Sequence, residues 1–87
     1  MIYINSKKVI NVICIKDVKY KNIIHCKKGN VYKCIIVDNY KHLNSDELFN
    51  ALKIISNENN HSHIIAIRKD LDWNSDKWFA ENFKIYE

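Results

Sequence analysis

The alternation of hydrophobic and polar residues predicts a small antiparallel sheet. Val9–Val18 is rich in β-branched residues and has the length of one strand, and His61–Lys69 has an apolar centre that predicts another. Val31–Val37 predicts a strand whose two faces are both mostly apolar, so each face needs a cover. The more polar stretch Lys19–Cys26 predicts a connection between the first two strands.

A helix is expected to cover the second face of the sheet. Residues 44–57 carry apolar side chains at helical spacing, namely Leu48, Ala51, Leu52 and Ile55. Asn44 or Ser45 can serve as the N-cap of this helix, and a polar run that begins at Asn57 ends it.

The last part of the chain predicts a polar turn, a short helical segment and a closing strand. Asp70–Ser75 forms the turn, Asp76–Phe83 is compatible with one or two helical turns, and Phe83–Tyr86 predicts the strand. A strand this short can leave the edge of the sheet open, so a homodimer formed by edge pairing is one alternative.

The single glycine of the chain marks a turn, and there is no proline. Gly29 lies between a basic turn and a β-branched run, where the backbone most needs a positive φ. Three cysteines, an odd number without a close pair, indicate reduced thiols and a cytoplasmic protein. No apolar run approaches the roughly 20 residues that span a bilayer, and Met1–Lys8 lacks the order of a signal peptide.

Charge is divided unevenly along the 87 residues. Residues 1–42 hold nine lysines and two aspartates, whereas residues 43–87 hold five basic and eight acidic residues. If the fold keeps these halves apart, the surface is polarised. Ile, Lys and Asn are abundant and Arg68 is the only arginine, which indicates an A/T-rich genome and means that some lysines reflect codon usage.

Two stretches carry a resemblance to a known family: Lys28-Gly29-Asn30-Val31-Tyr32-Lys33 and Trp78-Phe79-Ala80-Glu81-Asn82-Phe83-Lys84-Ile85. Together they resemble the small SH3-like β-barrel proteins of bacteriophage and other mobile-element genomes. The resemblance covers both ends of the chain and implies a strongly bent antiparallel sheet with a short C-terminal helical turn. The helix expected at about 44–58 would be an insertion between its strands, so the expected fold is α+β, with one domain over residues 1–87. The resemblance also implies a binding platform without catalytic residues.

No arrangement of residues predicts catalysis, a metal or a cofactor. Asp70, Asp72, Asn74, Asp76 and Glu81 have the spacing of a Ca²⁺ loop. However, a serine stands where the loop needs glycine, and a strand rather than a helix is expected before it. A polar turn that caps the next helical turn is therefore favoured. The cysteines and histidines lack the close pairs typical of zinc sites, and a non-enzymatic protein is expected.

A surface on a host protein is the first expected partner, for example on an antiviral nuclease of the CRISPR type that the protein would inhibit. The contact residues predicted for it are Trp73, Asp70, Asp72 and Asp76. Trp73 either is exposed as an interface anchor or folds back over the end of the sheet, while Trp78 is expected in the core.

Nucleic acid is the alternative partner. Five lysines in the first half would contact phosphates, and tyrosines are interleaved with them; the lysines are Lys19, Lys21, Lys27, Lys28 and Lys33. The near absence of arginine argues against base-specific recognition, because the bidentate guanidinium is the favoured reader of bases.

Overall fold

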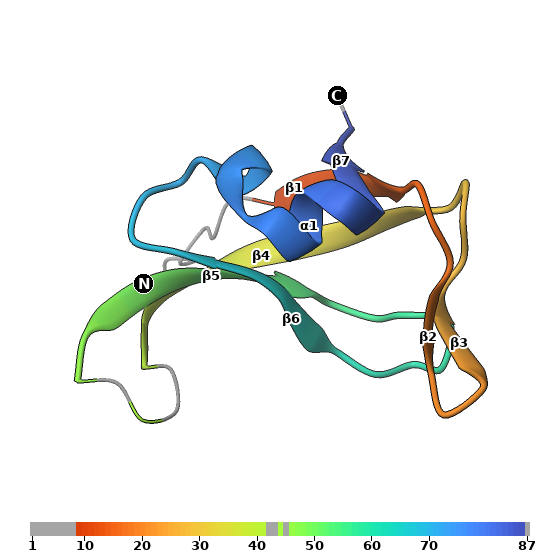
Figure 1. Ribbon diagram of the computed structural model, residues 1–87, viewed down its shortest axis with the longest axis horizontal. Helices are drawn as coiled ribbons and strands as arrows, with labels where there is room; N and C mark the ends of the chain where they lie inside the picture. The colour runs from red at the N-terminus through yellow and green to blue at the C-terminus, as the bar shows by residue number, and fades with distance from the viewer. Residues whose placement is uncertain (1–8, 42–43, 45, 87) are drawn as a thin grey trace, which may run out of the picture.

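A computed structural model describes residues 9–41, 44 and 46–86 of the chain. In this part, a strongly curled five-stranded antiparallel sheet is accompanied by a separate two-stranded hairpin and one short α-helix (Figure 1). Ser45, one of the two expected helix caps, and Met1–Lys8 lie outside the described residues. No helix of the described part has the length and apolar character needed to cross a membrane.

The order of the strands brings the beginning and the end of the chain together. The large sheet has the order β6-β5-β4-β1-β7, and every neighbouring pair is antiparallel. Strands β2 and β3 form the hairpin at one end of the molecule (Figure 1). The elements are β1 (Val9–Cys14), β2 (Val18–Tyr20), β3 (Ile23–Cys26), β4 (Val31–Lys41), β5 (Leu48–Ile54), β6 (His63–Arg68), the 3₁₀ turn η1 (Trp73–Ser75), α1 (Lys77–Asn82) and β7 (Phe83–Ile85).

The helix expected at residues 44–58 is wrong, because this stretch contains the strand β5. Strand β5 lies between β4 and β6, and its adjacent residues Ala51 and Leu52, which point to opposite faces of the sheet, are both fully buried. That composition also satisfies a helical spacing over a short window. Asn44 has a φ of 66° and lies in a turn, which does not fit the extended backbone of an N-cap.

The expected connection Lys19–Cys26 is also wrong, since it forms most of the β2–β3 hairpin. Its two turn residues, Lys21 and Asn22, have φ values of 52° and 65°. Two-residue hairpins favour positive φ at both positions, but the usual sequence signal is a glycine at the second. Gly29 itself has a φ of 94°, as its position predicted.

The core lies on the concave face of the sheet. Val12, Cys34 and Leu52 point into it from β1, β4 and β5, and α1 covers them (Figure 1). Phe79 of α1 stacks on Phe83 at the start of β7, with ring centroids 5.8 Å apart. Both phenyl rings are fully buried, so they join the helix to the sheet.

The opposite face of the sheet has no helix over it in the described part of the chain. Residues that alternate with the core positions of β4 point there, and Val31 and Lys33 are exposed while Ile35 and Val37 are half-buried. The residues that were expected to form a helix over this face form the strand β5 instead. The apolar character of both faces of β4, evident in the sequence, therefore leaves an exposed hydrophobic surface.

The buried thiols predict that stability falls at alkaline pH. Cys14, Cys26 and Cys34 are free and buried, and burial raises the pKa of Cys26 and of Cys34 to about 12. Since the thiols ionise near 9.0 once exposed, the free energy of unfolding should fall as pH rises from about 9 towards 12. The free energy of unfolding should fall by at most about 1.4 kcal/mol per thiol for each pH unit.

Urea unfolding at pH 7, 9 and 10.5 measures this slope. Cys34→Ala should lower stability at every pH but give a shallower decline, because one of the ionising groups is gone. A free energy of unfolding that stays constant across these pH values would contradict the burial of the thiols.

Candidate functional site

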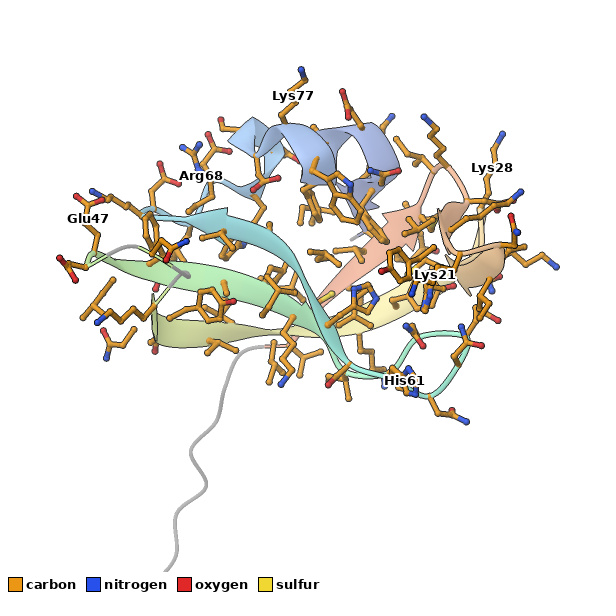
Figure 2. The ribbon with its side chains drawn as sticks, turned by 60° about the horizontal axis from the view of Figure 1, so that its bottom comes forward. Lys21, Lys28, Glu47, His61, Arg68 and Lys77 are labelled. Carbon is orange, nitrogen blue, oxygen red and sulfur yellow. The ribbon has the colours of Figure 1, made fainter. Side chains whose placement is uncertain are left out.

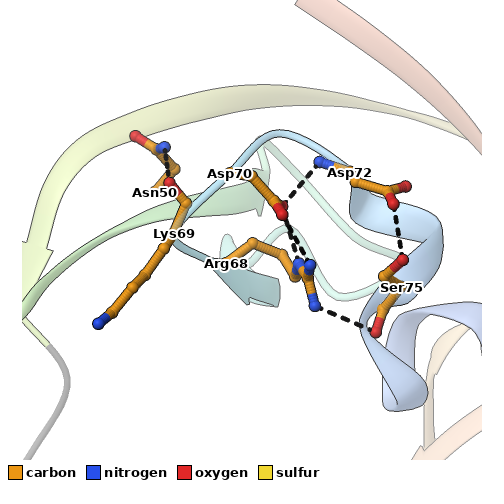
Figure 3. Close-up of polar contacts among 6 residues, drawn as sticks. All are labelled: Asn50, Arg68, Lys69, Asp70, Asp72 and Ser75. Atoms are coloured by element: carbon orange, nitrogen blue, oxygen red, sulfur yellow. Dashed lines mark hydrogen bonds and ion pairs between the residues drawn. The ribbon is translucent and has the colours of Figure 1, made fainter.

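The aspartates expected to contact a partner are bonded within their own loop (Figure 3). The Arg68 guanidinium donates to both carboxylate oxygens of Asp70, at 2.9 and 2.8 Å, and the Asp72 backbone N–H donates to Asp70 Oδ1 at 3.0 Å. The hydrogen bond from Arg68 holds the pKa of Asp70 at about 2. Ser75 Oγ donates to Asp72 Oδ2 at 2.6 Å. Hydrogen bonds within the loop thus satisfy the carboxylates of Asp70 and Asp72 without an external ligand.

Asp76 joins the helix to the edge of the sheet. Its Oδ1 accepts the backbone N–H of Phe79 at 2.9 Å, which is the N-cap bond of α1. Its Oδ2 accepts the backbone N–H of Ile67 in the edge strand β6 at 3.1 Å. One carboxylate therefore caps the helix and satisfies an outward-pointing N–H of the sheet.

The two tryptophans decide between the expected alternatives for Trp73 and show that the prediction for Trp78 is wrong. Trp73 is only 4% exposed and belongs to the core cluster, so it folds back over the sheet and is not an exposed anchor. Trp78, expected in the core, is 44% exposed. The reason is the phase of α1: Phe79 points inward, and its neighbour Trp78 lies about 100° round the helix, on the flank.

The predicted lysines do not form a single patch. Lys19 and Lys21 lie on the β2–β3 hairpin, while Lys27 and Lys28 lie in or beside the turn between β3 and β4, at the same end of the molecule. Figure 2 shows Lys21 and Lys28 at this end and Glu47 and Arg68 at the other. Lys33 belongs to the opposite face of the sheet.

We call the end that carries the hairpin and the β3–β4 turn the basic end. Residues 16–28 contain five lysines and one aspartate, a net charge of +4. The exposure of these lysines gives the surface a positive potential to which anions are attracted.

A cleft of about 350 Å³ opens at the basic end, between the hairpin, α1 and the segment that leads into β6. Tyr20 and His25 line it from the hairpin, Trp78 from the helix, and His61 and His63 from the segment before and at the start of β6. Neighbouring rings form a row along one wall: the centroids of Tyr20 and His25 are 6.3 Å apart, and those of His25 and His63 are 6.4 Å apart.

Asn57 determines which nitrogen of His25 carries the proton. The Asn57 side-chain oxygen accepts the backbone N–H groups of Asn59 and His61, at 2.7 and 3.1 Å, and this orients the amide. Its NH₂ group therefore faces His25 Nδ1 at 3.4 Å and donates to it. Since Nδ1 accepts, the neutral ring has its proton on Nε2 and can donate from there.

His63 lies deeper in the cleft, with Nε2 3.8 Å from the Sγ of Cys26. Burial and then the nearby His25 lower the pKa of His63, so its ring is neutral at pH 7. The described residues contain no group of three histidines, cysteines or acidic residues that could hold a metal. The cleft thus offers flat rings and hydrogen-bonding groups rather than a metal centre.

A hydrogen-bond network from the buried Tyr32 to the exposed Glu58 links the segment after β5 to the hairpin. The Tyr32 hydroxyl donates to Glu58 Oε2 at 2.7 Å and accepts the backbone N–H of Lys27 at 2.8 Å. The backbone N–H of Glu58 donates to the carbonyl of His25 at 3.0 Å. Burial, with a further contribution from the Glu58 bond, raises the pKa of Tyr32 to about 12, so the hydroxyl keeps its proton.

A second groove, of about 450 Å³, lies between Ile10, Ile36, Trp73 and Tyr86. It is larger, and neither it nor the cleft at the basic end has a lysine, arginine or carboxylate among its lining residues. The cleft at the basic end combines exposed rings, polar groups and adjacent lysines, and it is the better candidate for a binding site.

Sequence reasoning considered His61 and His63 only as metal ligands and assigned Trp78 to the core. Tyr20 stood out only as a tyrosine among lysines. No local spacing could have grouped them, because the hairpin, the helix and the segment before β6 meet only in the folded chain.

The chain matches no protein-family model, no curated protein and no solved structure. No activity, ligand or partner can therefore be transferred from a relative. Function has to be argued from the chemistry of the cleft and of the basic end.

Loss of the Asp76 carboxylate should destabilise the fold. We expect Asp76→Ala to lower the free energy of unfolding by about 2 kcal/mol, because it removes an N-cap bond and leaves the N–H of Ile67 without its acceptor. Asp76→Asn keeps one acceptor oxygen and should lower the free energy of unfolding by less. Urea unfolding measures the effect, with the exposed Asp38→Ala as control; equal stability of Asp76→Ala and Asp38→Ala would contradict the role of Asp76.

Proposed function

We propose that the protein is a non-enzymatic nucleic-acid-binding protein whose contact surface is the basic end with its cleft. The observation that carries the proposal is the position of two exposed aromatic side chains beside the hairpin lysines. Tyr20 is 63% exposed and Trp78 44% exposed, and both line the cleft. Lys19 and Lys21 flank Tyr20 on the same hairpin.

Each kind of side chain has a distinct part in such binding. Lysines neutralise phosphates and release counterions, which contributes affinity regardless of sequence. Exposed rings stack on bases, again with little sequence preference. The only arginine, Arg68, is paired with Asp70 at the other end of the molecule (Figure 2). We therefore expect binding that is sensitive to salt and tolerant of sequence.

The curled sheet is, in this proposal, an SH3-like barrel of a bacteriophage or mobile-element protein that acts in the cytoplasm of the host cell. Three features support it. Gly29 precedes the long strand β4, Trp78 lies in the short helix that Phe83 follows at the start of the last strand, and β7 pairs with the first described strand, β1.

A host protein is the second candidate partner, including an antiviral nuclease of the CRISPR type. The observation that favours it is the uncovered face of the sheet, where Val9, Val31 and Ile55 are about half exposed. Apolar side chains in such numbers on one face are typical of protein contacts. This face differs from the predicted contact residues Asp70, Asp72, Asp76 and Trp73, which are bonded or buried.

Removal of the hairpin charges tests the first proposal. We expect Lys19→Gln/Lys21→Gln to weaken binding of a labelled single-stranded 20-mer about tenfold or more at low salt. The slope of log Kd against log salt should become shallower by about 0.7 for each phosphate that the variant no longer neutralises. Fluorescence anisotropy between 50 and 300 mM salt measures both quantities.

The matched control is Lys41→Gln/Lys69→Gln, which removes the same charge at the other end of the molecule. The proposed surface would be contradicted if salt did not change the affinity, or if the two double variants lost the same amount of affinity. Capture of a host protein that survives nuclease treatment and depends on Val31 would instead support the second candidate.

A further inference from the structure

We infer that the cleft receives a single unpaired base, so that the protein prefers single-stranded nucleic acid to duplex; this inference rests on the proposed function. The volume of about 350 Å³ admits one flat heterocycle but not a base pair with its backbones. Tyr20 and Trp78 stand at the exposed rim, on the hairpin and on the helix, where their rings are accessible to a base that enters the cleft.

The interior of the cleft supplies directed polar groups. His25 has its proton on Nε2, because Asn57 donates to its Nδ1, so the ring can donate one hydrogen bond. Asn59 supports the same arrangement: its NH₂ group donates to the carbonyl of Ile24 at 3.0 Å and lies 3.5 Å from His25 Nδ1. Two amides with fixed orientation thus prepare one donor for a carbonyl or ring-nitrogen acceptor, and both kinds of acceptor occur on bases.

Positive charge lies where the flanking phosphates would be. Lys21 Nζ lies over the Tyr20 ring, 5.4 Å from its centroid, so this cation is held at the rim of the cleft. Lys19 precedes Tyr20 on the same strand, and its side chain projects from the other face of β2. A base bound beside Tyr20 therefore has one cation, Lys21, next to it for a flanking phosphate, which a free heterocycle would not exploit.

A duplex cannot use the cleft in the same way. Its bases are paired and stacked, and one of them would have to leave the helix at a cost of a few kcal/mol before it could enter. Duplex DNA would still meet the lysines of the basic end. The expected preference for single strands is consequently due to the rings of the cleft and not to the charge.

The decisive experiment compares one oligonucleotide as a single strand and as a duplex. We expect wild-type protein to bind a labelled 15-mer single strand at least about tenfold more tightly than the 15-bp duplex. Tyr20→Ala and Trp78→Ala should each weaken single-strand binding about five- to hundredfold and leave duplex binding nearly unchanged. Tyr86→Ala, an equally large and exposed ring beside the other groove, should change neither.

The Tyr20→Ala variant tests the cleft without a large effect on stability. Trp78 also contacts the buried Phe83, with centroids 6.0 Å apart, so its loss can lower stability. Tyr20 is mostly exposed, and Tyr20→Ala should melt within a few degrees of the wild type.

The outcomes separate the two levels of the proposal. Equal affinity for both oligonucleotides, with salt-dependent binding that Tyr20→Ala leaves intact, overturns the base pocket but leaves nucleic-acid binding by the lysines. Absence of binding to either oligonucleotide overturns the proposed function together with the pocket. A preference for the single strand that Tyr20→Ala abolishes supports both.

Discussion

The fold depends on covering the concave face of one curled sheet with only a short segment of chain. The segment that contains η1 and α1 does this with two aromatic residues, Trp73 and Phe79, and both are buried. A six-residue helix has little stability of its own, so it needs anchors to the sheet. Asp76 supplies one, between the N–H of Ile67 and that of Phe79, and the stack on Phe83 supplies another.

This attachment also decides what the helix exposes. With Phe79 directed at the core, Trp78 faces the β2–β3 hairpin and becomes part of the cleft. The hairpin contributes the opposite wall, and Asn57 holds His25 at the back through an amide that is itself fixed by backbone donors. The shape of the cleft therefore depends on how α1 is attached to the sheet.

The misassigned elements share a physical cause. The stretch around β5 has apolar residues at consecutive positions, on both faces of the sheet, and over seven residues such a run fits a helix as well as a strand. The hairpin turn at Lys21 and Asn22 adopts positive φ without glycine, so the strongest local signal of a hairpin is missing. Pairing with β4 and β6 makes β5 a strand, and pairing of β2 with β3 across the turn forms the hairpin.

The sequence by itself determined the runs that form β1, β4, β6 and β7, the turn at Gly29, the short helix before the last strand and the excess of lysine in the first half. These properties depend on local composition and backbone preference. Only the tertiary structure decided that Trp73 is buried and Trp78 exposed, and that Tyr20 and His63 share a cleft. The phase of a helix and the meeting of distant segments depend on packing across the whole sheet, which no window of the sequence contains.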